Sequence, residues 1–165
     1  MITGKDDLLQ SLIEVFIMEK ATKLFYEEAA GKAKSPHVRK TFDELSQWEE
    51  RHMDFIQSLY QSVNGDQEIM SFNDFKNRVA APVAEGGIPI KDLEVKMGKY
   101  VVETEKGALT LAMEIEGKAF NLYRKLSLHS EDANAKVLFE EMMDQEVKHI
   151  NYLKELKVRL AEAHS

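Results

Sequence analysis

The chain has 165 residues and no cysteine, a length typical of one domain that buries its own core. The absence of thiolates excludes disulfides, cysteine-ligated zinc sites and iron–sulfur clusters. The formal net charge of −7 argues against a nucleic-acid binder, which needs a basic face.

The N-terminal residues lack the basic and apolar regions of a signal peptide. Residues 8–18 form the most apolar stretch, but it is too short and too interrupted by polar residues to span a bilayer. We therefore expect a cytoplasmic protein with neither a membrane nor a nucleic acid as its partner.

Four long segments carry apolar residues at helical spacing. We predict helices over about residues 6–33, 36–63, 104–129 and 132–163. Ser35 and Pro36 provide an N-cap and a first-turn proline for the second helix, and Asn64-Gly65 provides its C-terminal stop.

Residues 64–103 separate the second and third helices. Phe72, Phe75 and Val79 predict a short helix there, and the segment 82–89, with two prolines and two glycines, predicts a break in regular structure. A connection this long is unusual unless it crosses a bundle. It can return along a helix of about 42 Å and leave the second and third helices parallel. We predict one all-α domain over residues 1–165, a four-helix bundle of two hairpins joined by a long crossover.

The second half of the chain repeats the first at an offset of 97 residues. The residues that recur are Glu19, Tyr26, Phe42, Glu49 and His52, which align with Glu116, Tyr123, Phe139, Glu146 and His149. The interval from the first Glu to the Glu-x-x-His motif is 30 residues in both copies. Two related hairpins would therefore form one bundle with approximate twofold symmetry.

The repeated polar residues predict a metal site inside the bundle. Each Glu-x-x-His places two side chains one turn apart on the same side of a helix, and all the repeated Glu lie on apolar stripes. Four ionised carboxylates in a core need compensation, which two divalent cations would provide. Oxygen-rich ligation with one imidazole per metal suits iron or manganese. The candidate ligands are Glu19, Glu49, His52, Glu116, Glu146 and His149.

Three aromatic residues lie near these candidates. Tyr26 and Tyr123 follow the first Glu of each repeat by seven residues, two turns along the same face. Because a buried phenol needs a partner, we predict that each donates to a ligating carboxylate of an opposed helix; plain core packing is the alternative. Trp48 is interpreted as a packing or interface residue rather than an electron relay.

The motifs resemble those of the ferritin-like superfamily, and most of all its rubrerythrin-type domain. The matching segments are Met18-Glu19-Lys20-Ala21 with Phe25-Tyr26, Trp48-Glu49-Glu50-Arg51-His52, Met113-Glu114-Ile115-Glu116 with Tyr123, and Gln145-Glu146-Val147-Lys148-His149. The resemblance implies a ferritin-like fold with a non-haem dinuclear iron site. It also implies terminal roles for Glu19 and Glu116, bridging roles for Glu49 and Glu146, and one histidine per iron.

Two features differ from the usual rubrerythrin pattern. Met113 and Ala119 stand where a further Glu would flank the ligand of the third helix, and the chain has no cysteine that could ligate a rubredoxin iron. An electron donor would therefore be a separate protein.

Three functions remain open. The first is an oxidoreductase that acts on hydrogen peroxide or dioxygen with an external electron donor. The second is Fe(II) oxidation with iron handling or storage, and the third is a bundle used only for protein interaction. We expect a homodimer or a larger homo-oligomer.

Overall fold

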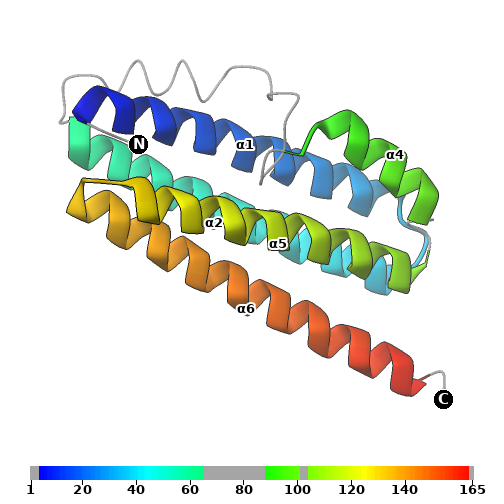
Figure 1. Cartoon of the computed structure of the whole chain (residues 1–165). Coiled ribbons are helices and arrows are strands. Elements are labelled where there is room, and N and C mark those ends of the chain that lie inside the picture. Colours follow the sequence, from blue (N-terminus) through cyan, green and yellow to red (C-terminus); the bar gives the residue numbers. More distant parts are fainter. Residues whose placement is uncertain (1–3, 65–87, 101–103, 164–165) are drawn as a thin grey trace.

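The computed structural model describes residues 4–64, 88–100 and 104–163. These residues form five helices: α1 (Lys5–Lys32), α2 (Pro36–Asn64), α4 (Ile90–Tyr100), α5 (Glu105–His129) and α6 (Ala133–Ala163). The helices α1 and α2 form one antiparallel hairpin, and α5 and α6 form the other (Figure 1). The helices α2 and α5 run in the same direction (Figure 1), so the end of α2 and the start of α5 lie at opposite ends of the bundle. The predicted all-α, ferritin-like fold is confirmed.

Side-chain caps at the start of α5 and α6 satisfy backbone N–H groups that have no partner within the helix. At the start of α2, the Ser35 carbonyl accepts the first backbone hydrogen bond of the helix, from the N–H of Arg39 at 3.0 Å. The Thr104 hydroxyl accepts from the N–H of Gly107 at 3.2 Å, and an Asp132 carboxylate oxygen accepts from the N–H of Ala135 at 2.8 Å. Each end of the four long helices lies within one residue of its predicted position.

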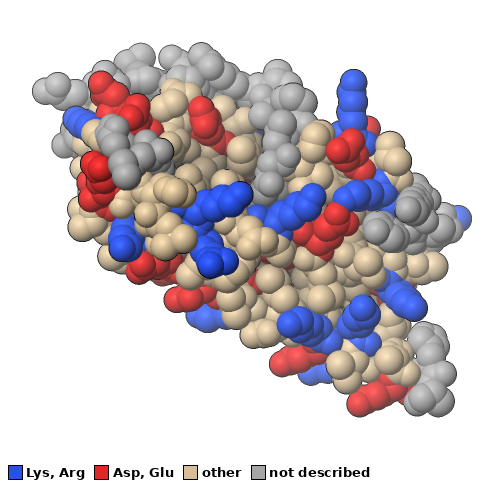
Figure 2. Space-filling model, viewed as in Figure 1, with Lys and Arg blue, Asp and Glu red and all other residues tan. Residues whose placement is uncertain are grey.

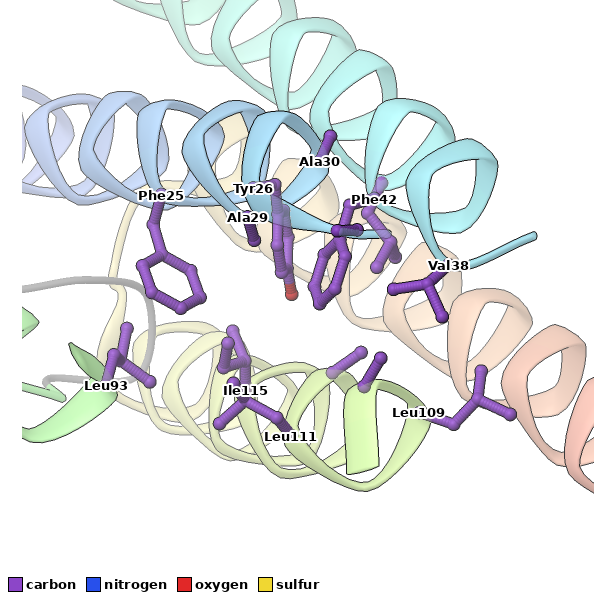
Figure 3. Close-up of a cluster of buried hydrophobic side chains, with 14 of the residues drawn as sticks. Phe25, Tyr26, Ala29, Ala30, Val38, Phe42, Leu93, Leu109, Leu111 and Ile115 are labelled. Carbon is purple, nitrogen blue, oxygen red and sulfur yellow. The ribbon is translucent and has the colours of Figure 1, made fainter. Parts of the chain in front are cut away.

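Helix α4 was not predicted from the sequence. The Pro89 carbonyl accepts from the N–H groups of Asp92 (3.0 Å) and Leu93 (3.2 Å), so this proline precedes a helix instead of ending regular structure. Leu93 is fully buried and packs in a cluster with Phe25 and Ile115 (Figure 3). The short helix predicted around residues 72–79 lies outside the described residues.

The core consists of two apolar layers, one at each side of a buried polar layer. The first layer includes Tyr26, Phe42, Leu45, Ile115 and Leu153. The second includes Leu12, Phe16, Ile56, Tyr123 and Phe139. On each long helix the repeated Glu, or Glu and His, lie between residues of the two layers. The apolar layers therefore separate the polar layer from water along the bundle axis.

The outer faces of the helices carry charges of both signs. Figure 2 shows acidic and basic side chains interspersed over the visible face. Pairs one helical turn apart, such as Lys23 with Glu27 at 2.9 Å and Lys32 with Glu28 at 2.6 Å, contribute to this pattern. None of the described helices combines the length and the hydropathy needed to cross a bilayer.

Candidate metal centre

The six candidate ligands come from all four long helices. Glu19 lies on α1, Glu49 and His52 on α2, Glu116 on α5, and Glu146 and His149 on α6. Five of them have no exposed surface, and His149 is 7% exposed. The structure therefore brings together, inside the bundle, all six residues selected from the repeat.

His52 joins carboxylates of both hairpins. Its Nδ1 lies 3.3 Å from Oε2 of Glu19 and 3.7 Å from Oε2 of Glu49. The same atom lies 3.2 Å from Oε1 of Glu146, which belongs to the other hairpin. The polar layer is therefore one cluster and not two separate sites.

His149 occupies the corresponding place in the second repeat. Its Nδ1 lies 3.2 Å from Oε2 of Glu116 and 3.5 Å from Oε2 of Glu146. The His52 and His149 rings stack with centroids 5.3 Å apart and an angle of 18° between their planes. Both imidazoles thus turn the same nitrogen toward the carboxylates.

The potential ligand atoms form three overlapping groups in which all atoms lie within 4.8 Å of one another. One group is Glu19, Glu49 and His52, and another is Glu49, Glu116 and His149. The third contains Glu146 and both histidines. Glu49 is therefore shared between two groups that each contain one histidine, and Glu146 lies beside both imidazoles.

The donor set fits a pair of oxygen-preferring transition metals. Oε1 of Glu19 is buried and has no hydrogen-bond partner among the described residues. A carboxylate oxygen left in this way is costly without a cation. Four carboxylates and two imidazoles match the ligand preferences of iron and manganese. The residues present therefore fit a dinuclear carboxylate centre.

The two tyrosines differ in their contacts. The Tyr26 hydroxyl donates to Oε1 of Glu116 at 2.8 Å, across the two hairpins. The hydrogen bond predicted for Tyr123 is not observed, because its hydroxyl has no hydrogen-bond partner among the described residues. The Tyr123 ring instead meets the His52 ring edge-on, at 6.3 Å and 83°. Burial and the negative charge of Glu146 raise the pKa of Tyr123 well above its usual value, so the phenol keeps its proton.

The contacts of the Glu116 side chain favour its ionised form. Burial acts to raise its pKa, but hydrogen bonds with Glu146, His149 and Tyr26, together with the charge of His149, outweigh burial and lower the pKa to about 2. The Glu116 side chain is therefore held as a carboxylate, the form that binds metals.

One neighbour of the site was not predicted to contact a candidate ligand. The indole of Trp48 stacks on the His149 ring at 4.1 Å, with 12° between the planes. No spacing within α2 indicates this contact, because the stack joins two helices that are far apart in the sequence. The only sequence signal is the departure from the repeat, since Gln145 occupies the position equivalent to Trp48.

The model of the rubrerythrin family matches residues 11–157, a range that includes all six candidate ligands. No curated protein sequence matches the chain significantly. The family match covers most of the chain, and the chain therefore belongs to the rubrerythrin family, whose ferritin-like domain is a di-iron carboxylate domain.

Proposed function

We propose that this chain binds two metal ions and reduces hydrogen peroxide, or activates dioxygen, with electrons from a separate donor protein. Iron is the first choice of metal, and manganese at one or both positions is the alternative. The observation that carries the proposal is the shared position of Glu49 between two groups that each hold one histidine.

The distances support a division of the ligands into terminal and bridging residues. Glu19 with His52, and Glu116 with His149, would each hold one metal. Glu49 and Glu146 would bridge, because each lies beside residues of both groups. Four carboxylates would balance the charge of two divalent cations, which accounts for the burial of so many acidic side chains.

The chain's own residues would prepare this site for chemistry on an O–O bond. A dinuclear iron centre supplies two electrons and two adjacent Lewis-acidic positions when it is bound. Tyr26 orients Glu116 through its hydrogen bond, and the two apolar layers exclude bulk water. The Tyr123 hydroxyl keeps its proton beside His52 and Glu146, where it could donate a hydrogen bond to an oxygen atom at the site. Among the six candidate ligands, only His149 has measurable exposure, which favours substrate entry from its side.

The direct test combines metal analysis with peroxide turnover. Protein loaded anaerobically with Fe(II) should bind two ions per chain and consume peroxide over many turnovers when a reductant is supplied. Glu49→Gln removes a charge at nearly constant shape and should abolish both properties. Glu50→Gln changes the exposed neighbour on the same helix and serves as the matched control. A wild-type chain that binds no metal would overturn the proposal.

The same experiment tests the alternative of iron handling or storage. In that case each iron would be oxidised once and retained as Fe(III), without continuing peroxide consumption. The mass in solution adds a second criterion. We propose a homodimer or a larger homo-oligomer, and storage needs a closed multi-subunit shell, so the mass of a dimer would exclude storage. Repeating the titration with Mn(II) determines the metal preference.

A further inference from the structure

The surroundings of the two histidines depart from the internal repeat at two positions. Trp48 stacks on His149 and Tyr152 lies against Trp48, whereas the equivalent positions in the other repeat are Gln145 and Phe55. An oxidisable aromatic pair is therefore present at these two positions and absent from the equivalent positions of the other repeat.

These rings form a continuous series from the buried site toward the surface. The Trp48 indole stacks on His149 at 4.1 Å, and the Tyr152 ring meets the indole edge-on at 5.2 Å and 77°. Both Trp48 and Tyr152 are half-buried. Tyr152 also lines a surface groove that includes the exposed residues Lys40 and Arg159. The series thus ends where an external molecule can approach.

The outer end of the series has a built-in proton acceptor. The Tyr152 hydroxyl donates to Oε2 of Glu44 at 2.5 Å, and Nζ of Lys40 lies 3.7 Å from Oε1 of the same carboxylate. Burial, followed by the hydrogen bond to Glu44 and the charge of Glu44, raises the pKa of Tyr152 to about 12. At neutral pH the phenol is therefore protonated and hydrogen-bonded to a carboxylate that can take its proton on oxidation.

We propose that Trp48 and Tyr152 form an electron path between the protein surface and the metal position at His149. The inference rests on the proposed function. The path acts when the chain holds a single ferrous ion at that position and meets peroxide. Reduction of peroxide to two waters requires two electrons, of which one ferrous ion supplies only one.

Tyr152 supplies the second electron through Trp48, and its phenolic proton moves to Glu44. One Fe(II), one phenol, one peroxide and two protons from solvent give one Fe(III), one neutral tyrosyl radical and two waters, with the phenolic proton held by Glu44. A one-electron donor at the surface, such as ascorbate, then reduces the radical, and Glu44 returns the proton. The path prevents the one-electron cleavage of peroxide that would release a hydroxyl radical.

The test uses the full chain loaded with one Fe(II) per chain and mixed with peroxide without a reductant. Rapid freezing and electron paramagnetic resonance should show a tyrosyl radical in the wild type and at least a tenfold weaker signal in Tyr152→Phe. Trp48→Phe keeps an aromatic ring but resists oxidation, so it should also lower the radical yield several-fold. Spin trapping should show more hydroxyl radical in both variants. Tyr60→Phe, a buried tyrosine that lies eight residues after His52, is the control and should match the wild type.

Two results would overturn the path. One is an equal radical yield in the wild type and Tyr152→Phe. The other is a radical that disappears only in Tyr123→Phe, which would place the oxidation beside His52. Failure of the proposed function is distinguishable, because it would appear as absent iron binding or absent peroxide consumption in the wild-type chain. Iron content and thermal unfolding, measured on the same samples, separate an electron-transfer defect from a folding defect.

Discussion

The two halves of the bundle present the same ligand types from equivalent helical positions, yet they surround them differently. His52 is fully buried and meets the edge of Tyr123, whereas His149 keeps slight exposure and is covered by Trp48. Glu116 is held by Tyr26, but Oε1 of Glu19 has no hydrogen-bond partner among the described residues. The two metal positions would therefore be similar in ligands and unequal in their surroundings.

Some features of this duplicated site follow directly from the repeat, and others do not. A ligand's place on its helix depends on helical periodicity, which both copies share. The contacts that a ligand makes with other side chains depend on residues of the opposite hairpin. These residues differ between the two copies, as Trp48 and Gln145 do. Glu116 is consequently oriented in the absence of a metal, whereas we expect the Glu19 carboxylate to reorient when a metal binds.

The largest expected effect separates bridging from terminal ligands. Glu146→Ala removes a charge and a ligand shared by both positions, so bound iron should fall from two ions per chain to fewer than one. Glu49→Ala, its repeat partner, should behave in the same way. His52→Ala removes one neutral ligand that water can replace, and should mainly weaken one position. Anaerobic Fe(II) titration with metal analysis measures the difference.

An exposed acidic residue of α6, Glu141, provides the control for this series, because Glu141→Ala should still bind two ions. Full two-iron binding and normal peroxide reactivity in Glu146→Ala would contradict the bridging role. Equal losses in His52→Ala and Glu146→Ala would contradict the distinction between the two kinds of ligand.

Metal removal should lower stability by the next largest amount. Metal that binds only the folded chain adds about 4 kcal/mol at a free concentration a thousand times the dissociation constant. For a chain of this size, that corresponds to a melting temperature higher by roughly 8–16 °C. We expect His52→Ala and His149→Ala each to retain part of this shift. Differential scanning calorimetry with and without Fe(II), under anaerobic conditions, measures it, and identical melting temperatures would rule out a metal centre of this kind.

The two tyrosines provide a smaller and more specific comparison in the metal-free protein. Tyr26→Phe removes a buried hydrogen bond to a carboxylate and should cost about 1.5–3 kcal/mol. Tyr123→Phe removes a buried hydroxyl for which the described residues offer no partner, so the free energy of unfolding should stay constant or increase. Urea unfolding at neutral pH measures both, and equal losses in the two variants would show that Tyr123 has an acceptor in solution.

The effect of Tyr26→Phe should also depend on pH. The pKa of Glu116 is lowered to about 2 from the ordinary value of 4.5, so its stabilising contribution is fully present above pH 4.5 and is lost as the pH falls toward 2. The difference between Tyr26→Phe and the wild type should therefore be largest above pH 4.5 and decrease in acid. Unfolding curves at several pH values measure this change, and a difference that grows in acid would contradict the assigned role of the hydrogen bond.

The smallest expected effect is spectroscopic. Trp48 is the only tryptophan in the chain and stacks on His149, so its fluorescence should report on metal at that position. Co(II), added anaerobically, should quench the fluorescence of the wild type and of His52→Ala. The same addition should change the fluorescence of His149→Ala much less. Equal quenching in the two histidine variants would show that Trp48 does not distinguish the halves.

Much of the architecture could be derived from the sequence, because it depends on local geometry. The spans of the long helices follow from helical periodicity and, for the second of them, from the Ser35-Pro36 start and the Asn64-Gly65 stop. The burial of Glu19, Glu49 and their repeat partners follows from their places on apolar stripes. These properties depend on residues a few positions apart, for which the rise and rotation of a helix are known.

Other features were decided only by the packing of the hairpins against each other. Helix α4 forms where Leu93 enters the core beside Phe25 and Ile115, which the residues around Pro89 do not indicate. The hydrogen bond from Tyr26 to Glu116 and the stack of Trp48 on His149 likewise join distant segments. The same packing leaves the Tyr123 hydroxyl without a hydrogen-bond partner among the described residues. Such contacts depend on the rotation and offset between helices, and these are set by the interlocking of all the core side chains together and not by the periodicity of any one helix.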